Sequence, residues 1–145
     1  MSAGTPSRAA AKITEKDLLE WGTRIGAAAH YDNVDRAQLE NLIISLDAVE
    51  GNESLLVTAA FALRQSQRDR GKPLISPRTA KLVAQALIHL YENNAGKKEA
   101  RKMLDFAKWV YEALGRGRGE GRPRFRGAPE KLTLEDLLKQ LAGGG

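Results

Sequence analysis

Residues 76–96 read SPRTAKLVAQALIHLYENNAG, and this stretch contains the signals that decide the fold. Ser76 followed by Pro77 is typical of a helix start, because serine caps free N–H groups and proline is tolerated at the first helical position. Apolar side chains then recur every three or four residues, which predicts a helix with one buried face. These side chains are Leu82, Val83, Ala86, Leu87, Leu90 and Tyr91.

Similar patterns on both sides of this stretch predict further helices. The expected ranges are about 15–29, 36–49, 54–70, 97–114 and 134–141. Three pairs have the spacing of helix caps: Thr14 with Asp17, Asp35 with Gln38, and Thr133 with Asp136. Gly71 is expected at the C-terminal end of the helix over 54–70. No run alternates cleanly between apolar and polar residues, so we predict an all-α protein, a compact bundle of about five helices.

The composition divides the chain into four parts. We expect a basic N-terminal arm over 1–13, a helical-bundle domain over 14–115, an Arg/Gly-rich linker or nucleic-acid-binding arm over 116–130, and a short C-terminal helix with a glycine tail over 131–145. The third part is rich in glycine and arginine and contains Pro123, so it lacks the apolar residues of a core.

Several classes of function are disfavoured by composition. The chain has no cysteine, which excludes disulfides, thiolate catalysis and cysteine-ligated zinc. We expect neither a signal peptide nor membrane insertion, because no apolar run is long enough. His30 lies beside Asp32 and Asp35, which leaves a metal or proton-transfer site open, although a turn between helices explains the same residues. We therefore expect a protein that is not an enzyme and has no cofactor.

Charge is the most informative feature of the sequence. The net charge is +5 and the pI is about 9.6, which favours a polyanionic partner. Residues 13–53 contain nine acidic and three basic side chains, whereas residues 54–128 contain sixteen basic and six acidic ones. This asymmetry predicts separate acidic and basic faces. The basic face would meet phosphate, and the acidic face would meet solvent or a neighbouring copy.

The candidate nucleic-acid-binding residues fall into three basic clusters and the N-terminal arm. They are Arg64, Arg68, Arg70 and Lys72; Arg78 and Lys81, in a stripe with Gln85 and His89; Arg116, Arg118, Arg122, Arg124 and Arg126; and, in the arm, Arg8 and Lys12. The structural alternatives are charges that suit a helix C-terminus, a solvated helix face and a solubilising linker. Lys97, Lys98, Arg101 and Lys102 oppose the dipole of their helix, which indicates an anionic partner.

No base-reading motif is present, so we expect sequence-independent contacts with phosphates. Neutralising eight phosphates of duplex DNA would give a slope of log affinity against log salt of about −7. Two other features have alternative explanations. Gly22 and Gly26 either let a second helix approach closely or merely weaken their own helix, and Trp21 and Trp109 are expected to be core or interface residues.

The layout of a basic arm with Arg8 and Lys12, a compact helical body and basic helix faces resembles the coat proteins of filamentous double-stranded DNA viruses of hyperthermophilic archaea. This resemblance implies a capsid protein whose copies wrap duplex DNA in a helical virion. The position of segment 116–126 departs from that layout, which puts in doubt which arm touches DNA.

Residues 31–36, Tyr31 to Arg36, are similar to a segment of the small helical subunit of CRISPR effector complexes. That resemblance implies a cytoplasmic nucleic-acid-binding subunit. We favour the coat protein, located in the virion, with duplex DNA and either identical copies or a paralogous subunit as partners. A chromatin-like protein and a protein-interaction adaptor are the remaining alternatives.

Overall fold

The computed structural model describes residues 12–67, 71–115 and 127–143. In these ranges the chain forms six α-helices and one short 3-10 turn, with no strand, which confirms the predicted all-α class. The helices are α2 (Glu15–Tyr31), α3 (Arg36–Ala48), α4 (Ser54–Gln65), α5 (Pro77–Glu92), α6 (Lys97–Ala113) and α7 (Leu134–Ala142), and the 3-10 turn η1 covers Pro129–Lys131.

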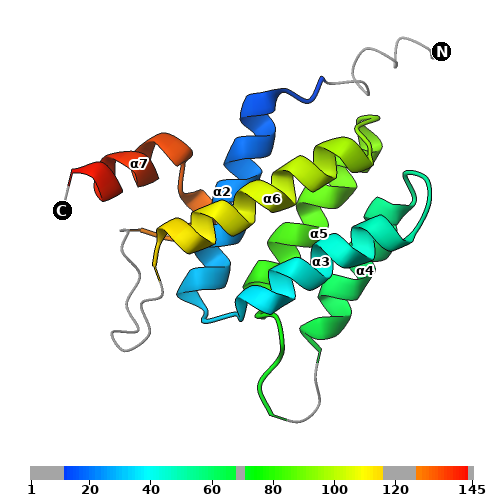
Figure 1. Ribbon diagram of the computed structural model, residues 1–145, viewed down its shortest axis with the longest axis horizontal. Coiled ribbons are helices and arrows are strands. Elements are labelled where there is room, and N and C mark those ends of the chain that lie inside the picture. Colours follow the sequence, from blue (N-terminus) through cyan, green and yellow to red (C-terminus); the bar gives the residue numbers. More distant parts are fainter. Residues whose placement is uncertain (1–11, 68–70, 116–126, 144–145) are drawn as a thin grey trace.

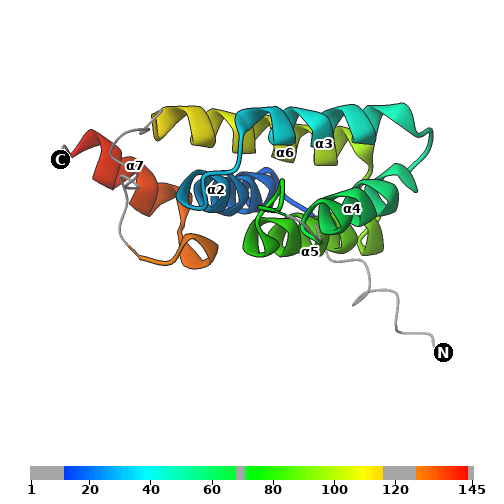
Figure 2. The same ribbon diagram turned by 90° about the horizontal axis from the view of Figure 1, so that it is seen from below.

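The helices of the bundle lie in two layers. Helices α3 and α6 form one layer, and α2, α4 and α5 form the other (Figure 2). Helix α2 packs on α6, and α4 packs on α5 as a helical hairpin (Figure 1). Helix α3 bridges the layers by packing on both α4 and α6. Helix α7 lies at one side of the bundle against α2.

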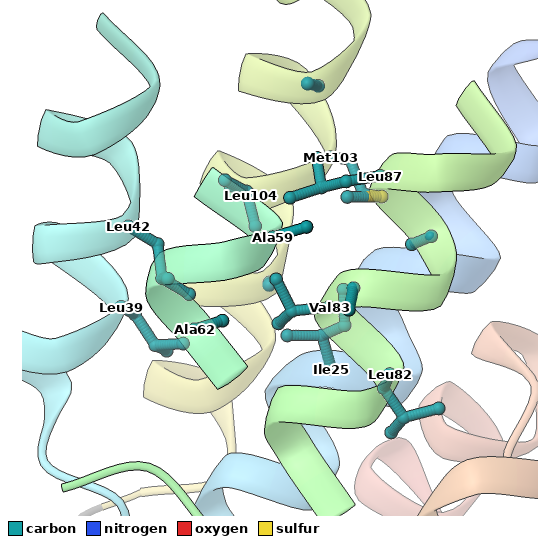
Figure 3. Packing of buried hydrophobic residues seen from close by; sticks show 14 of the residues in the cluster. Ile25, Leu39, Leu42, Ala59, Ala62, Leu82, Val83, Leu87, Met103 and Leu104 are labelled. Atoms are coloured by element: carbon teal, nitrogen blue, oxygen red, sulfur yellow. The ribbon is translucent and has the colours of Figure 1, made fainter. Parts of the chain in front are cut away.

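The core is built from aliphatic side chains of all five bundle helices. Ile25 of α2, Leu42 of α3, Ala59 of α4, Leu87 of α5 and Leu104 of α6 are all buried in one cluster (Figure 3). Because these side chains are small or compact, the five helices approach closely and share one main core.

The glycine pair of α2 allows this helix to cross α6 at short range. A Cβ atom added to Gly22 would lie 2.9 Å from the carbonyl oxygen of Met103, and one added to Gly26 would lie still closer to that of Ala107. Backbone atoms cannot move aside as a flexible side chain does. The close approach of α6 therefore explains the glycine pair, and not a mere weakening of α2.

Most helix starts follow the predicted capping pattern. Thr14 and Asp17 form a reciprocal capping box, with the Asp17 N–H 3.1 Å from Thr14 Oγ1 and the Thr14 N–H 2.9 Å from the Asp17 carboxylate. Ser76 caps α5, and Thr133 accepts the Asp136 N–H at 3.1 Å. The prediction for α3 was wrong in one respect, because Asp35 makes no capping bond through its side chain.

Helix α4 ends earlier than predicted. It stops at Gln65 and not near residue 70, and Gly71 adopts a positive φ of 65° within the following loop. The hydroxyl of Ser66 donates to the carbonyl of Leu63 at 2.7 Å. Such a local bond offers the backbone an alternative to further helix. The chain then returns, and the N–H of Leu74 donates to Gln65 O at 3.2 Å, closing the α4–α5 hairpin.

The C-terminal helix packs on its own bundle. Leu137 of α7 is buried in a second small cluster that also contains Ala27, Val110, Leu114 and Leu132. The N–H of Leu134 donates to the Glu20 carboxylate at 3.0 Å, and Arg24 Nε donates to the carbonyl of Leu132 at 3.2 Å. These contacts dock α7 on the bundle of its own chain.

Candidate nucleic-acid interface

The acidic and basic parts of the chain meet at the surface where α2 and α3 adjoin α6. At the start of α6, Lys102 Nζ lies 3.1 Å from Glu15 of α2, and Arg101 Nη1 lies 2.7 Å from Asp47 of α3. Lys97 donates to the carbonyl of Val49 at 2.8 Å. Two of the four cations that oppose the α6 dipole are thus matched by acidic neighbours in the same chain, and a third donates to a backbone carbonyl.

The same complementarity continues along α6. Glu112 lies 2.8 Å from Arg36, and Lys108 lies 3.6 Å from Glu40. The hypothesis of separate acidic and basic faces is therefore wrong for this region, because the acidic helices α2 and α3 pack directly on α6. Basic side chains that remain free for a polyanion must be sought elsewhere.

Arg78 is a structural clamp at the start of α5. Its guanidinium makes two hydrogen bonds to Asp32, from Nη2 to Oδ1 at 2.6 Å and from Nε to Oδ2 at 3.2 Å. Nη1 donates to Glu130 at 3.3 Å, and Cζ lies 4.9 Å from the ring centroid of Tyr31. Hydrogen bonding to Asp32 raises the pKa of Arg78, while partial burial opposes this shift. This arginine joins three segments, so its charge is already matched.

The end of the α4–α5 hairpin where the loop joins the two helices carries exposed cations. Arg64 is exposed in the last turn of α4, Lys72 in the connecting loop and Lys81 in the second turn of α5. Within the described ranges none of the three forms an ion pair. Lys81 lines a shallow groove of about 450 Å³ between α5 and η1, together with Arg78, Gln85 and Glu130. We call Arg64, Lys72 and Lys81 the basic end.

The residues that border segment 116–126 are anchored near the basic end. On one side, the carbonyl of Gly115 accepts a hydrogen bond from His30 Nε2 at 2.8 Å. On the other side, Glu130 pairs with Arg78. His30 belongs to the last turn of α2, and Arg78 binds Asp32 directly after that helix. The segment therefore leaves and rejoins the bundle around the C-terminus of α2, beside the start of α5.

The structure does not bring all of the predicted nucleic-acid-binding residues together. Lys12 is exposed and precedes α2, whose 17 residues separate it from the basic end by about 25 Å. The other predicted contacts lie outside the described residues; they are Arg8, Arg68, Arg70, Arg116, Arg118, Arg122, Arg124 and Arg126. Of the α5 stripe, Lys81, Gln85 and His89 are exposed, whereas Arg78 is partly buried.

His30 and its neighbours form a polar joint between segments. Its ring lies edge-on to Tyr111, with centroids 5.6 Å apart, and its Nε2 binds Gly115. Asp32 faces Arg78 and Ser76, and not His30. In the part of the chain that is described, no three His, Asp or Glu side chains gather in a way that would hold a metal ion. The chemistry of this cluster is that of a hydrogen-bonded joint.

The two tryptophans have different environments. Trp21 is partly buried against the core and lies 6.4 Å from the ring of His89, as expected for a core residue. Trp109 is 67% exposed and contacts the edge of Phe106.

Of the described helices, none combines the length and the apolar character that crossing a membrane requires.

Three residues of the joint were not singled out as anchors from the sequence. They are His30, Asp32 and Glu130, whose residue types are common at helix ends and turns. Their hydrogen-bond partners lie 85, 46 and 52 positions away along the chain. Only the tertiary fold reveals them.

Comparison of the chain with known protein families, characterised proteins and solved structures finds no match.

Proposed function

We propose that this chain is a structural protein that coats duplex DNA through repeated copies, with contacts to backbone phosphates and no catalytic step. The observation that carries the proposal is the joining of the basic segments at one end of the bundle. The α4–α5 loop and the start of α5 meet there, and both borders of segment 116–126 are tied to the same place.

The free cations support this proposal because their charges are not matched within the described residues. Arg64, Lys72 and Lys81 are exposed, in contrast to Lys102 and Arg101, which pair with acidic neighbours. A cation without an acidic partner gains most from a phosphate, since it gives up no ion pair on binding.

Segment 116–126 adds five arginines to this end. Arginine presents a fork of donors that fits phosphate oxygens, and glycine places few restrictions on the backbone. Gly115 and Glu130, which lie on either side of the segment, are both anchored, so the arginines are connected to the bundle on both sides. Contacts of arginine with backbone phosphates do not read the bases, so affinity is expected to depend on salt and hardly on sequence.

Electron microscopy of the protein mixed with random-sequence duplex DNA tests the coating function. We expect regular filaments whose length follows that of the DNA, and their loss when Arg122, Arg124 and Arg126 are changed to Gln. Truncation after Leu114 is a poor test, because it also removes Leu132 and Leu137 from the second apolar cluster. Binding restricted to single-stranded RNA would transfer the proposal to the RNA-binding subunit of a larger complex, and no binding to either would refute it.

A further inference from the structure

Helix α4 exposes an apolar face that the bundle does not cover. Leu56, Val57 and Leu63 are 37%, 43% and 42% exposed, and Ala60 is exposed between them. They lie on the side opposite Ala59 and Ala62, which point into the core (Figure 3). No charged residue occurs from Ser54 to Leu63. A helix that is apolar on both sides is normally buried on both sides, so this face is a site of association.

The two ends of this face carry opposite charges. Glu53 precedes α4, and Arg64 lies in its last turn. Both are exposed, Glu53 makes no capping bond, and in the described ranges neither forms an ion pair. Helix α5 runs antiparallel to α4 and repeats this polarity, with exposed Lys81 beside the end of α4 and exposed Glu92 beside its start.

We infer that this face binds a second copy of the chain, with the two α4 helices antiparallel about a two-fold axis near Ala60. Antiparallel pairing brings Glu53 of each copy within about one helical turn (roughly 4.5 Å along the axis) of Arg64 of the other, a gap that the long arginine side chain spans, so two ion pairs form across the interface. The same operation places Val57 opposite Leu63. A small residue at the centre allows the helices to approach to the 8–10 Å axis separation that is typical of packed helices (about 8 Å for small side chains).

A second copy fits this face better than an unrelated partner does. A two-fold interface must be self-complementary, and here one helix supplies an acidic end, an apolar centre with a small residue in its middle, and a basic end. A lipid surface would leave Glu53 without a partner. The inference is tested without nucleic acid, so its outcome is separate from that of the proposed function. It assigns Arg64, one of the three cations of the basic end, to the contact between copies and leaves Lys72 and Lys81 to phosphate.

Because the chain has no cysteine, a single introduced cysteine can form a disulfide only with the same cysteine of another copy. We expect Ala60→Cys to form a disulfide-linked dimer on mild oxidation, because the two Cα atoms at the axis lie within the roughly 7 Å that a disulfide requires. Glu53→Cys serves as the matched control, since antiparallel pairing separates its two copies by about 20 Å. Efficient crosslinking of Glu53→Cys with none of Ala60→Cys would overturn the antiparallel arrangement.

A charge swap measured by sedimentation equilibrium tests the contacts themselves. Glu53→Arg and Arg64→Glu alone each place like charges together at both ends of the interface, and we expect the dimer Kd to rise at least about tenfold. The double variant Glu53→Arg with Arg64→Glu restores opposite charges and should return the Kd to within about threefold of the wild type. Failure of the double variant to recover would overturn the proposed pairing.

The apolar centre is tested with a control on another face. Leu63→Ser should abolish the dimer at micromolar concentration, whereas Ile44→Ser should leave it intact, because Ile44 is 63% exposed on α3. Circular dichroism checks that both variants remain folded. A wild-type protein that is monomeric at all accessible concentrations would overturn the inference, whatever the outcome of the DNA experiments.

Discussion

Arg78 and Asp32 form the closest ion pair between α5 and the end of α2, with Nη2 and Oδ1 2.6 Å apart. Ser76 also donates to Asp32 at 2.7 Å, and Glu130 holds the other side of the guanidinium. The pair is therefore part of a network that ties the start of α5 to η1. Through Glu130 it holds one border of segment 116–126 beside the end of α2, while His30 holds the other border at Gly115.

The first prediction concerns Arg78. Arg78→Met should lower the free energy of unfolding by about 1–3 kcal/mol, because it leaves the largely buried Asp32 carboxylate without its main partner. Lys81→Met, one turn further along α5 and exposed, should change stability by less than about 0.5 kcal/mol. Urea denaturation measures both. A stable Arg78→Met variant with weakened DNA binding would instead make Arg78 a phosphate ligand.

The second prediction concerns the crossing of α2 and α6. Gly26→Ala should destabilise the protein by about 2 kcal/mol, because the new methyl group would press on the backbone carbonyl of Ala107 and outweigh the better helix propensity of alanine. Gly22→Ala should cost less, because its Cβ would lie 2.9 Å from the Met103 carbonyl oxygen, a less severe approach than that to Ala107 at Gly26. Thermal unfolding of the two variants shows which substitution destabilises the protein more. Equal stability of Gly26→Ala and the wild type would contradict the close crossing.

The third prediction concerns α7. Leu137→Ala should undock this nine-residue helix, because Leu137 is its main buried side chain and such truncations cost about 2–5 kcal/mol. Hydrogen exchange should accelerate over residues 129–142 while the core of α2 and α6 stays protected. Leu138→Ala is the control, since Leu138 is 53% exposed and should leave exchange unchanged.

The fourth prediction concerns pH. The N–H of Gly96 donates to Glu99 Oε1 at 2.9 Å, and this bond lowers the pKa of Glu99 below its ordinary value of 4.5, although burial opposes the shift. The folded state therefore binds this proton less readily than the unfolded state does. The resulting stability is present above pH 4.5 and is lost as the pH falls through the lowered pKa.

Glu99→Gln should remove this part of the acid sensitivity. The effect is small, about 0.5 kcal/mol, as is typical of one partly buried capping interaction at a helix start. Chemical denaturation at a series of pH values between about 6 and 3 measures it by the difference between the variant and the wild type. Parallel stability curves for the two proteins would contradict the role of Glu99 as the cap of α6.

The helices were largely predictable from the sequence because their signals are local. Ser76 with Pro77 and Thr14 with Asp17 mark helix starts through contacts within one turn. The end of α4 was missed because the competing bond from Ser66 to Leu63 leaves no distinct pattern in the sequence.

The candidate interface was less predictable, because charge composition does not reveal which charges meet. Arg78 and Lys81 look alike in the sequence, yet the fold pairs Arg78 with Asp32 and leaves Lys81 exposed. Likewise, the cations of α6 are matched by Glu15 and Asp47, which lie far away along the chain. Only the packing of α2 and α3 on α6 separates matched from unmatched charges.

The salt dependence of binding to random-sequence duplex DNA tests the central claim most directly. We predict that log affinity falls steeply with log salt, and that Lys72→Gln with Lys81→Gln reduces the slope by about 1.8, or about 0.9 for each lost phosphate contact. Lys16→Gln with Lys98→Gln removes the same charge from exposed lysines elsewhere and should leave the slope unchanged. Equal changes in the two double variants, or no binding at about 50 mM salt, would contradict binding at the basic end.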